Sequence, residues 1–120
     1  MEYLKLCDSD YRFMTIVWDN AHVSSGRLVQ LCNEQLGWKK STTYTAIKKL
    51  AQKGYLVNEN AVVSVVIPRE RVQHDESNYF VERTFGGSLP GFLTAFLGEK
   101  KISKKEADKI KKIIDSYSEK

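Results

Sequence analysis

Hydrophobic residues recur every three to four positions through the first half of the chain, and that period predicts helices. A first helix is expected over residues 10–19. The polar run 8–10 can cap its start with side-chain oxygens. An apolar face follows, made of Tyr11, Met14, Val17 and Trp18. The short apolar segment 21–23 that comes next is able to pair as a minor strand.

Two further helices are expected, each with its own start and stop signals. The second begins within Ser24-Ser25-Gly26 and ends at Gly37, a residue suited to a left-handed C-cap. The third covers residues 41–53, and Gly54 stops it. Its inward positions are Thr43, Ala46, Ile47, Leu50 and Ala51, and its opposite positions are Ser41, Tyr44, Thr45, Lys48 and Lys49.

The pattern then changes to that of strands. Residues 55–57 and 62–67 are rich in β-branched side chains, and polar Asn58-Glu59-Asn60 separates them, which is typical of a β-hairpin. Pro68 ends the second strand. Three helices followed by a hairpin is the order of a winged helix-turn-helix. The fold class expected is therefore mainly α, with residues 1–68 as a winged-helix DNA-binding domain.

Residues 69–120 differ in character and predict a helical dimerisation domain. A long polar helix is expected over 69–85, a shorter apolar one begins at Ser88, and residues 103–106 match a capping box before a last helix. A tail this small cannot bury all its large apolar groups, so a second copy is expected to cover them. The residues expected at this interface are Tyr79, Phe80, Phe85, Leu89, Phe92, Leu93, Phe96, Leu97, Ile110, Ile113, Ile114 and Tyr117.

Positive charge is concentrated in one segment, although the net charge of the chain is only +4. Residues 39–53 contain five lysines and no acid, while the whole chain has 15 acids. Lysines neutralise phosphates, and hydroxyls bond phosphate oxygens or base edges, so the segment suits a helix that enters the major groove. A solvated surface helix is the alternative for this segment taken alone. The DNA-binding residues predicted are Lys39, Lys40, Ser41, Thr42, Tyr44, Thr45, Lys48 and Lys49.

Other kinds of chemistry find no support in the sequence. No catalytic triad or phosphate-binding glycine loop can be made out, and His22 and His74 lie in different segments, so no enzyme activity, metal or cofactor is expected. Cys7 and Cys32 are expected to be buried thiols in a reducing compartment. No run of about 20 apolar residues and no signal-peptide pattern occurs, so a cytoplasmic protein without membrane contact is expected.

The order and spacing of these motifs resemble the penicillinase-repressor family, which includes beta-lactamase, methicillin-resistance and copper-responsive repressors. Residues 11–18 are similar to its W-x-V-M-x-x-V-W opening, with Tyr11 in place of the first tryptophan. Residues 38–50 are similar to its recognition segment W-s-x-x-T-x-x-T-x-x-x-R-L, and Lys53-Gly54 to the K-K-G ending that follows. Residues 85–89 resemble the turn inside its dimerisation region. The resemblance extends from about residue 8 to residue 117.

The resemblance implies a homodimer that binds a palindromic operator in double-stranded DNA and keeps it silent. In the antibiotic-responsive branch a membrane sensor protease signals release, and the repressor is cut at an Asn-Phe bond. The corresponding pair here is Ala95-Phe96. In the copper-responsive branch a C-terminal Cys-x-Cys pair binds metal, but residues 109–120 contain no cysteine. Neither route is expected, and release by a ligand, a sensor protease or an antirepressor stays open.

The wing leaves a second function open. Residues 58–61 are short and include Glu59, where wings that grip the DNA backbone have arginine or lysine. A purely structural hairpin tip is the expectation for this segment. It favours the alternative of a winged-helix protein-interaction module that does not read DNA, whereas the absence of acids over 39–53 favours the repressor. Tyr44 stands where some family members have arginine, so the operator sequence does not carry over.

Overall fold

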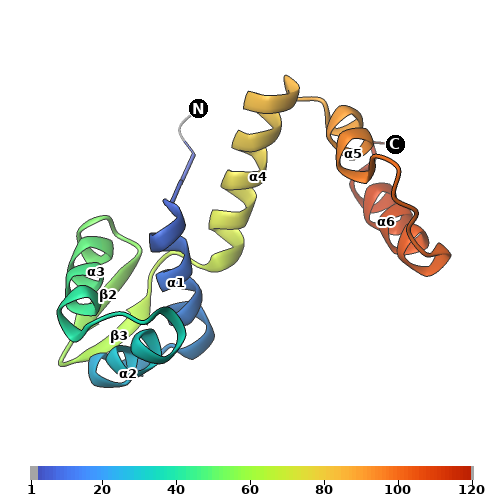
Figure 1. Ribbon diagram of the computed structural model, residues 1–120. Helices are drawn as coiled ribbons and strands as arrows, with labels where there is room; N and C mark the ends of the chain where they lie inside the picture. Colours follow the sequence, from blue (N-terminus) through green and yellow to red (C-terminus); the bar gives the residue numbers. More distant parts are fainter. Residues whose placement is uncertain (1–2, 120) are drawn as a thin grey trace. The chain divides into compact units, whose positions relative to one another are not determined.

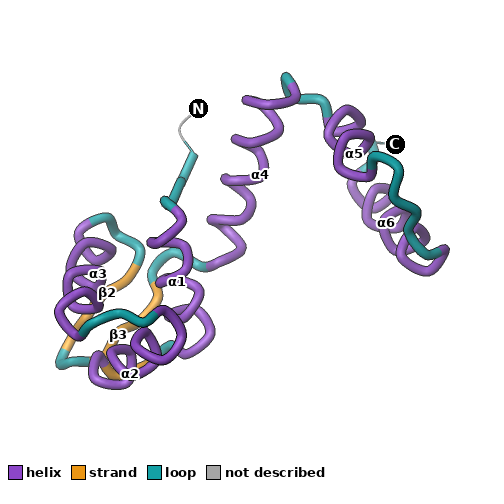
Figure 2. Tube along the Cα trace, in the orientation of Figure 1, coloured by secondary structure: helices purple, strands orange, loops and turns teal. Residues whose placement is uncertain are grey.

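The computed structural model describes residues 3–119. These residues form six helices and one three-stranded antiparallel sheet (Figures 1 and 2). They divide into two compact units, the first ending at Phe80 and the second beginning at Val81. The helical content, with a hairpin after the third helix that belongs to one small sheet, confirms the expected fold class.

Helix α1 (Asp8–Asn20) begins earlier than predicted. Its N-cap is Cys7, whose side chain makes no capping hydrogen bond. The acidic residues Asp8 and Asp10 lie within the first turn, where the positive end of the helix dipole stabilises negative charge. The prediction that these residues cap the helix from outside was therefore wrong, because the dipole, rather than a capping bond, accounts for their position.

Helices α2 (Ser25–Leu36) and α3 (Lys40–Gln52) follow their start and stop signals closely. The Ser24 hydroxyl accepts a hydrogen bond from the Arg27 amide at 3.1 Å and so caps α2. Gly37 ends α2 in the left-handed conformation, with φ of 69° and ψ of 23°. Both signals are confirmed. Helix α3 begins one residue before the predicted start, and Lys39 is its N-cap.

The sheet has the order β1-β3-β2. Strand β1 (Val23–Ser24) pairs antiparallel with β3 (Val62–Val65), which in turn pairs with β2 (Leu56–Glu59). Glu59 faces Val62 across the hairpin, so the loop holds only Asn60 and Ala61, both with positive φ. A two-residue loop with positive φ at both positions matches the right-handed twist of the two strands. The strand pairing can therefore continue through Asn58 and Glu59 up to the loop.

The core of the first unit lies between α1, α2, α3 and the sheet. Four of the five inward positions predicted for α3 are buried, which confirms the helical phase, and Ala51 is partly buried against the core. The Trp38 ring stacks on Phe13 with 5.8 Å between ring centroids and holds the turn before α3 against α1. Cys32 is buried, but Cys7 is exposed, and the expectation of two buried thiols was wrong for Cys7 because it precedes α1 at the surface.

Helix α4 (Arg69–Phe85) has the predicted bounds and buries Val72 and Asp75 in the first unit. Helices α5 (Leu89–Leu97) and α6 (Lys104–Tyr117) belong to the second unit. The Ser88 hydroxyl caps α5, and the Ser103 hydroxyl accepts from the Glu106 amide at 3.1 Å, which confirms both predicted starts. No helix among residues 3–119 is long and apolar enough to cross a membrane.

Candidate nucleic-acid interface

A three-residue turn joins α2 to α3 and fixes how α3 is presented. The Gly37 amide donates to the Asn33 carbonyl at 3.0 Å, and the Trp38 amide donates to the Cys32 carbonyl at 3.2 Å. The Asn33 side chain then donates to the Trp38 carbonyl at 3.1 Å. Together these three hydrogen bonds close the end of α2 and fix the position at which α3 starts. The pair is a helix-turn-helix with an ordered connection.

The predicted DNA-binding residues all lie on the surface. Lys39, Lys40, Ser41, Thr42, Tyr44, Thr45, Lys48 and Lys49 are exposed, while the core side of α3 is buried. Within this set, Ser41, Tyr44, Thr45 and Lys48 share one face by their spacing. We call these four residues the α3 face. The structure therefore brings hydroxyls, one aromatic ring and one ammonium together along about two turns of helix.

Two hydroxyls of the α3 face already donate to the protein. The Thr45 hydroxyl donates to the Ser41 carbonyl at 2.9 Å. The Tyr44 hydroxyl donates to the Ser25 hydroxyl at 3.4 Å, and the Tyr44 side chain is 37% exposed. Because Ser25 lies in α2, this contact supports the Tyr44 ring from the neighbouring helix. The Lys40 ammonium lies 6.0 Å from the centroid of the same ring.

Lys49 has a partner that the sequence pattern did not predict. Its ammonium lies 2.9 Å from a carboxylate oxygen of Asp10, and Lys53 approaches the same oxygen at 3.8 Å. The Asp10 side chain is 6% exposed, whereas that of Lys49 is 46% exposed. Asp10 lies one helix away in α1, so inspecting residues 39–53 alone could not reveal the pair. The signal available was an acid in the first turn of a helix that packs against α3.

Burial alone would raise the pKa of the Asp10 carboxyl. Hydrogen bonds from Lys49 and Cys7, together with the charges of Lys49 and Lys53, outweigh that effect and bring this pKa below its ordinary value of 3.8. The same hydrogen bond to Asp10 raises the pKa of Lys49. Asp10 is therefore ionised at neutral pH, and one lysine of α3 serves first as its counter-charge.

Arg27 adds a cation that the sequence analysis did not single out. It lies exposed in the first turn of α2, and its guanidinium donates to the Gln30 side chain at 3.0 Å. In a helix-turn-helix the first helix crosses the DNA backbone, so a basic residue at its start is placed for phosphate. The wing adds no such group, because the hairpin carries Glu59 and no lysine or arginine from Leu56 to Val65.

The residues predicted for the dimer interface separate into two groups. Tyr79 and Phe80 belong to the first unit, where Tyr79 packs edge-on against Tyr3 at 6.4 Å. The others lie in the second unit, in which no residue of 81–119 is buried. Phe85 and Phe92 are in edge contact at 5.6 Å. Five large side chains there are more than two-fifths exposed: Leu89, Phe96, Ile113, Ile114 and Tyr117. Tyr117 is 85% exposed.

Comparison with known proteins agrees with this architecture. The sequence model of the penicillinase repressor family matches residues 6–116. The penicillinase repressor of Bacillus licheniformis is 21% identical over 120 aligned positions, which cover 94% of this chain and 91% of that protein. The family match extends over the helix-turn-helix, the wing and both tail helices. The chain belongs to the penicillinase repressor family of transcriptional regulators.

Proposed function

We propose that this protein is a dimeric transcriptional repressor that binds a palindromic operator through α3. The observation that carries the proposal is the α3 face, in which hydroxyls and lysines lie exposed on the second helix of an ordered helix-turn-helix. No acid lies within residues 39–53, and the carboxylate that pairs with their lysines among the described residues, Asp10, is compensated by Lys49. Residues 1–68 bind DNA and residues 69–120 hold the dimer. The protein acts in the cytoplasm, where the operator lies.

The contact between Tyr44 and Ser25 determines which groups of α3 are left to contact bases. Because the Tyr44 hydroxyl already donates to Ser25, the ring itself is the part left for the groove. The Thr45 hydroxyl is engaged at Ser41, so its methyl group is likewise presented outward. Apolar groups of this kind contact the methyl group of thymine, while Lys48 and Lys40 supply charge. Specificity then rests on shape at Tyr44 and Thr45, and non-specific affinity rests on the lysines.

The test begins by selecting binding sites from random duplexes with the full-length protein. We expect an enriched sequence with two inverted half-sites about one helical turn apart. Tyr44→Ala should then lose roughly 1–3 kcal/mol on that duplex and little on a scrambled one. Tyr44→Phe should retain most of the specific affinity, since it keeps the ring. Fluorescence anisotropy at two salt concentrations measures both.

A matched control separates base contact from local helix effects. Thr45→Ala removes a methyl group and a hydroxyl that bonds the carbonyl four residues earlier. Thr15→Ala does the same in α1, where the Thr15 hydroxyl donates to the Tyr11 carbonyl at 2.8 Å. Only Thr45→Ala should reduce specific binding. If Tyr44→Ala and Thr45→Ala bind the selected duplex as the wild type does, α3 is not the reading element.

Dimerisation through the tail rests on the exposed apolar side chains of the second unit. Ile110, Ile113, Ile114 and Tyr117 follow the spacing of one face of α6, and three of them are exposed large hydrophobics. A face of this kind in water is costly, and a second copy covers it. Sedimentation equilibrium should give a dimer at micromolar concentration. Phe96→Glu and Ile113→Glu should give monomers, whereas Lys112→Glu, on the polar side of α6, should not.

The protein-interaction module is the second candidate, and the observation that favours it is a wing without lysine or arginine. A module of this type would bind no duplex from the random pool above its non-specific level. Selection of no sequence, with a dimer still present by sedimentation, would favour this candidate over the repressor.

A further inference from the structure

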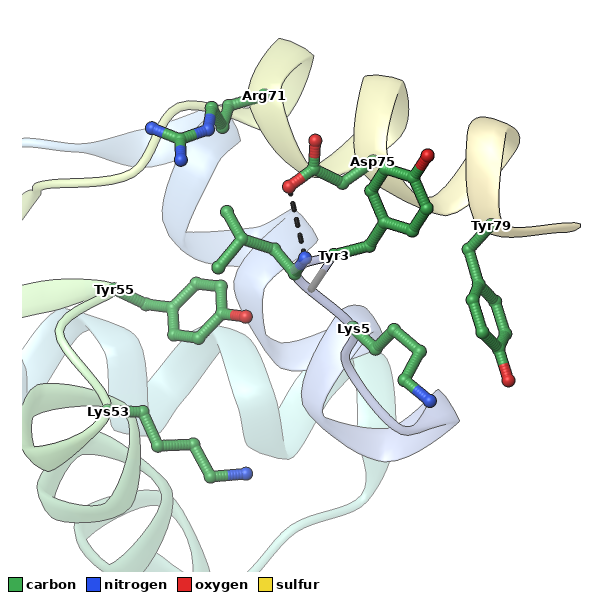
Figure 3. Close-up of a pocket in the computed structure, with 8 residues that line it drawn as sticks. Tyr3, Lys5, Lys53, Tyr55, Arg71, Asp75 and Tyr79 are labelled. Carbon is green, nitrogen blue, oxygen red and sulfur yellow. Dashed lines mark hydrogen bonds between the residues drawn. The ribbon is translucent and has the colours of Figure 1, made fainter. Parts of the chain in front are cut away.

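An open pocket of about 900 Å³ lies within the first unit, away from the α3 face. Three segments line it: residues 3–5 before α1, the α3–β2 connection with Lys53 and Tyr55, and the start of α4 with Arg71, Asp75 and Tyr79. Figure 3 shows these side chains, with the Tyr55 ring reaching into the pocket between Lys53 and Arg71. The volume is within the range of pockets that hold small molecules.

Tyr55 gives the pocket a rigid polar group. Its amide donates to the Leu50 carbonyl at 2.9 Å, and its carbonyl accepts from the amides of Val66 and Ile67. The residue is 4% exposed. Its hydroxyl points into the pocket, toward residues 3–5, and makes no hydrogen bond with any residue from 3 to 119. A hydroxyl without a protein partner, carried by a buried ring and aimed into an open space, is suited to a ligand.

Burial raises the pKa of the Tyr55 hydroxyl, and the charges of Glu76, Asp75 and Asp10 raise it further. The hydroxyl therefore remains protonated well above neutral pH. It is available as a hydrogen-bond donor to an acceptor inside the pocket.

The charged groups of the lining are predominantly positive. Lys5, Lys53 and Arg71 face one carboxylate, Asp75. Asp75 is already engaged, because one of its oxygens accepts from the Leu4 amide at 3.0 Å and the other lies 3.2 Å from a His74 ring nitrogen. Arg71 makes no ion pair within 4.0 Å of any described residue. Its guanidinium is therefore available to an anion, which it can hold with two parallel hydrogen bonds.

Rings and apolar groups occupy the rest of the lining. Tyr3 and Tyr79 are in edge contact, and the Lys5 ammonium lies 4.3 Å from the Tyr79 ring centroid. Leu4 completes this wall. The pocket thus combines an unpartnered guanidinium, a hydroxyl donor on a buried ring and an aromatic wall, which together suit an oxyanion attached to a flat or apolar body.

We propose that this pocket binds a small oxyanion, a carboxylate or a phosphate monoester that carries a ring or similar apolar body. Arg71 and Tyr55 hold the oxyanion, Lys53 and Lys5 add charge, and the tyrosine rings contact the body. The proposal goes beyond DNA binding and does not depend on it. A ligand here touches both the end of α3 and the start of α4, so it stabilises the contact between them.

The test uses the full-length protein and three probes: phenyl phosphate, benzoate and inorganic phosphate. Isothermal titration should show saturable binding of phenyl phosphate or benzoate, and at least about tenfold weaker binding of inorganic phosphate, which lacks the body. The melting temperature should rise with the concentration of the bound probe. Arg71→Ala should weaken binding about tenfold or more, and Tyr55→Phe should weaken it by roughly three- to tenfold.

Two control variants match these changes outside the pocket. Arg12→Ala removes an exposed guanidinium from α1, and Tyr11→Phe removes a hydroxyl from a half-buried ring there. Both should bind the probes as the wild type does. Absence of saturable binding by all three probes would overturn the proposal. So would equal weakening by Arg12→Ala and Arg71→Ala, because that result would indicate general attraction by the positive protein. Loss of operator binding with intact probe binding would leave this site standing.

Discussion

Lys48 and Lys49 are neighbours in α3, yet the structure predicts opposite consequences for their removal. The sequence pattern assigns both to DNA binding. In the structure, Lys49 lies 2.9 Å from Asp10, while Lys48 is exposed and makes no ion pair with a described residue. We therefore expect Lys48→Ala to change DNA binding and Lys49→Ala to change stability.

The magnitude for Lys48 follows from counterion release. Each phosphate contact contributes about 0.9 to the slope of log affinity against log salt. Loss of one contact per protomer should flatten that slope by about 0.9, or by about 1.8 for a dimer on two half-sites. Over a fourfold rise in salt, one contact corresponds to roughly a 3.5-fold change in affinity, and two to roughly twelvefold. Titrations from 50 to 200 mM salt resolve effects of this size.

Lys49→Ala should lower the melting temperature, because the nearly buried Asp10 carboxylate loses its closest counter-charge. Its salt slope should stay near that of the wild type. Asp10→Asn supplies the control, since it removes the charge that Lys49 compensates. The Asp10→Asn, Lys49→Ala double variant should melt higher than the sum of the two single losses predicts. The reasoning is refuted if Lys49→Ala leaves the melting temperature unchanged and flattens the slope as much as Lys48→Ala.

Three further outcomes are expected from the same structure. Gly37→Ala should cost about 1 kcal/mol in urea unfolding, because φ is +69° and an added Cβ meets no atom within 4 Å, so backbone strain alone acts. Thr43→Val should raise stability by up to about 1 kcal/mol in the same assay, since the buried Thr43 hydroxyl has only the weakly bonding Cys32 thiol as a partner among residues 3–119. Folding lowers the pKa of Asp10, so the ionised carboxylate stabilises the protein above about pH 4, and this stabilisation is lost as the pH falls through the pKa of the folded state. The melting temperature of Asp10→Asn should therefore fall less steeply at acid pH than that of the wild type.

Local signals account for the parts of the fold that could be predicted from the sequence. Gly37, Ser88 and Ser103 act within their own turns of the chain, and each does so as expected. The buried face of α3 follows from its period alone. Such signals involve residues at most a few positions apart, so a single sequence contains all the information they need.

The features that the sequence does not predict correctly depend on contacts between residues far apart in the chain. The segment 39–53 alone predicts that Lys49 binds DNA, since its partner Asp10 lies 39 positions earlier, in another helix. The sequence predicts a hairpin loop over residues 58–60, whereas the loop in the structure is Asn60–Ala61. Ala61 has no intrinsic preference for a positive φ, so its place in the turn could not be read from the sequence. The Ala61 carbonyl accepts from the Ser25 amide at 2.9 Å, a tertiary contact that stabilises this backbone. The pocket around Tyr55 likewise joins three distant segments.

The short wing limits how much charge the protein can bring to DNA. The Asn60–Ala61 loop is tied to α2 through Ser25, and the hairpin contributes no cation, so it cannot reach along the backbone with a basic tip. With Lys49 engaged by Asp10, the cations left around the helix-turn-helix are Arg27, Lys39, Lys40 and Lys48. Four phosphate contacts per protomer correspond to a salt slope of about −3.6, and two protomers to about −7. A protein with this ceiling on charge must gain much of its affinity from holding two half-sites at once. We therefore expect tight operator binding to depend on the exposed apolar tail rather than on the wing.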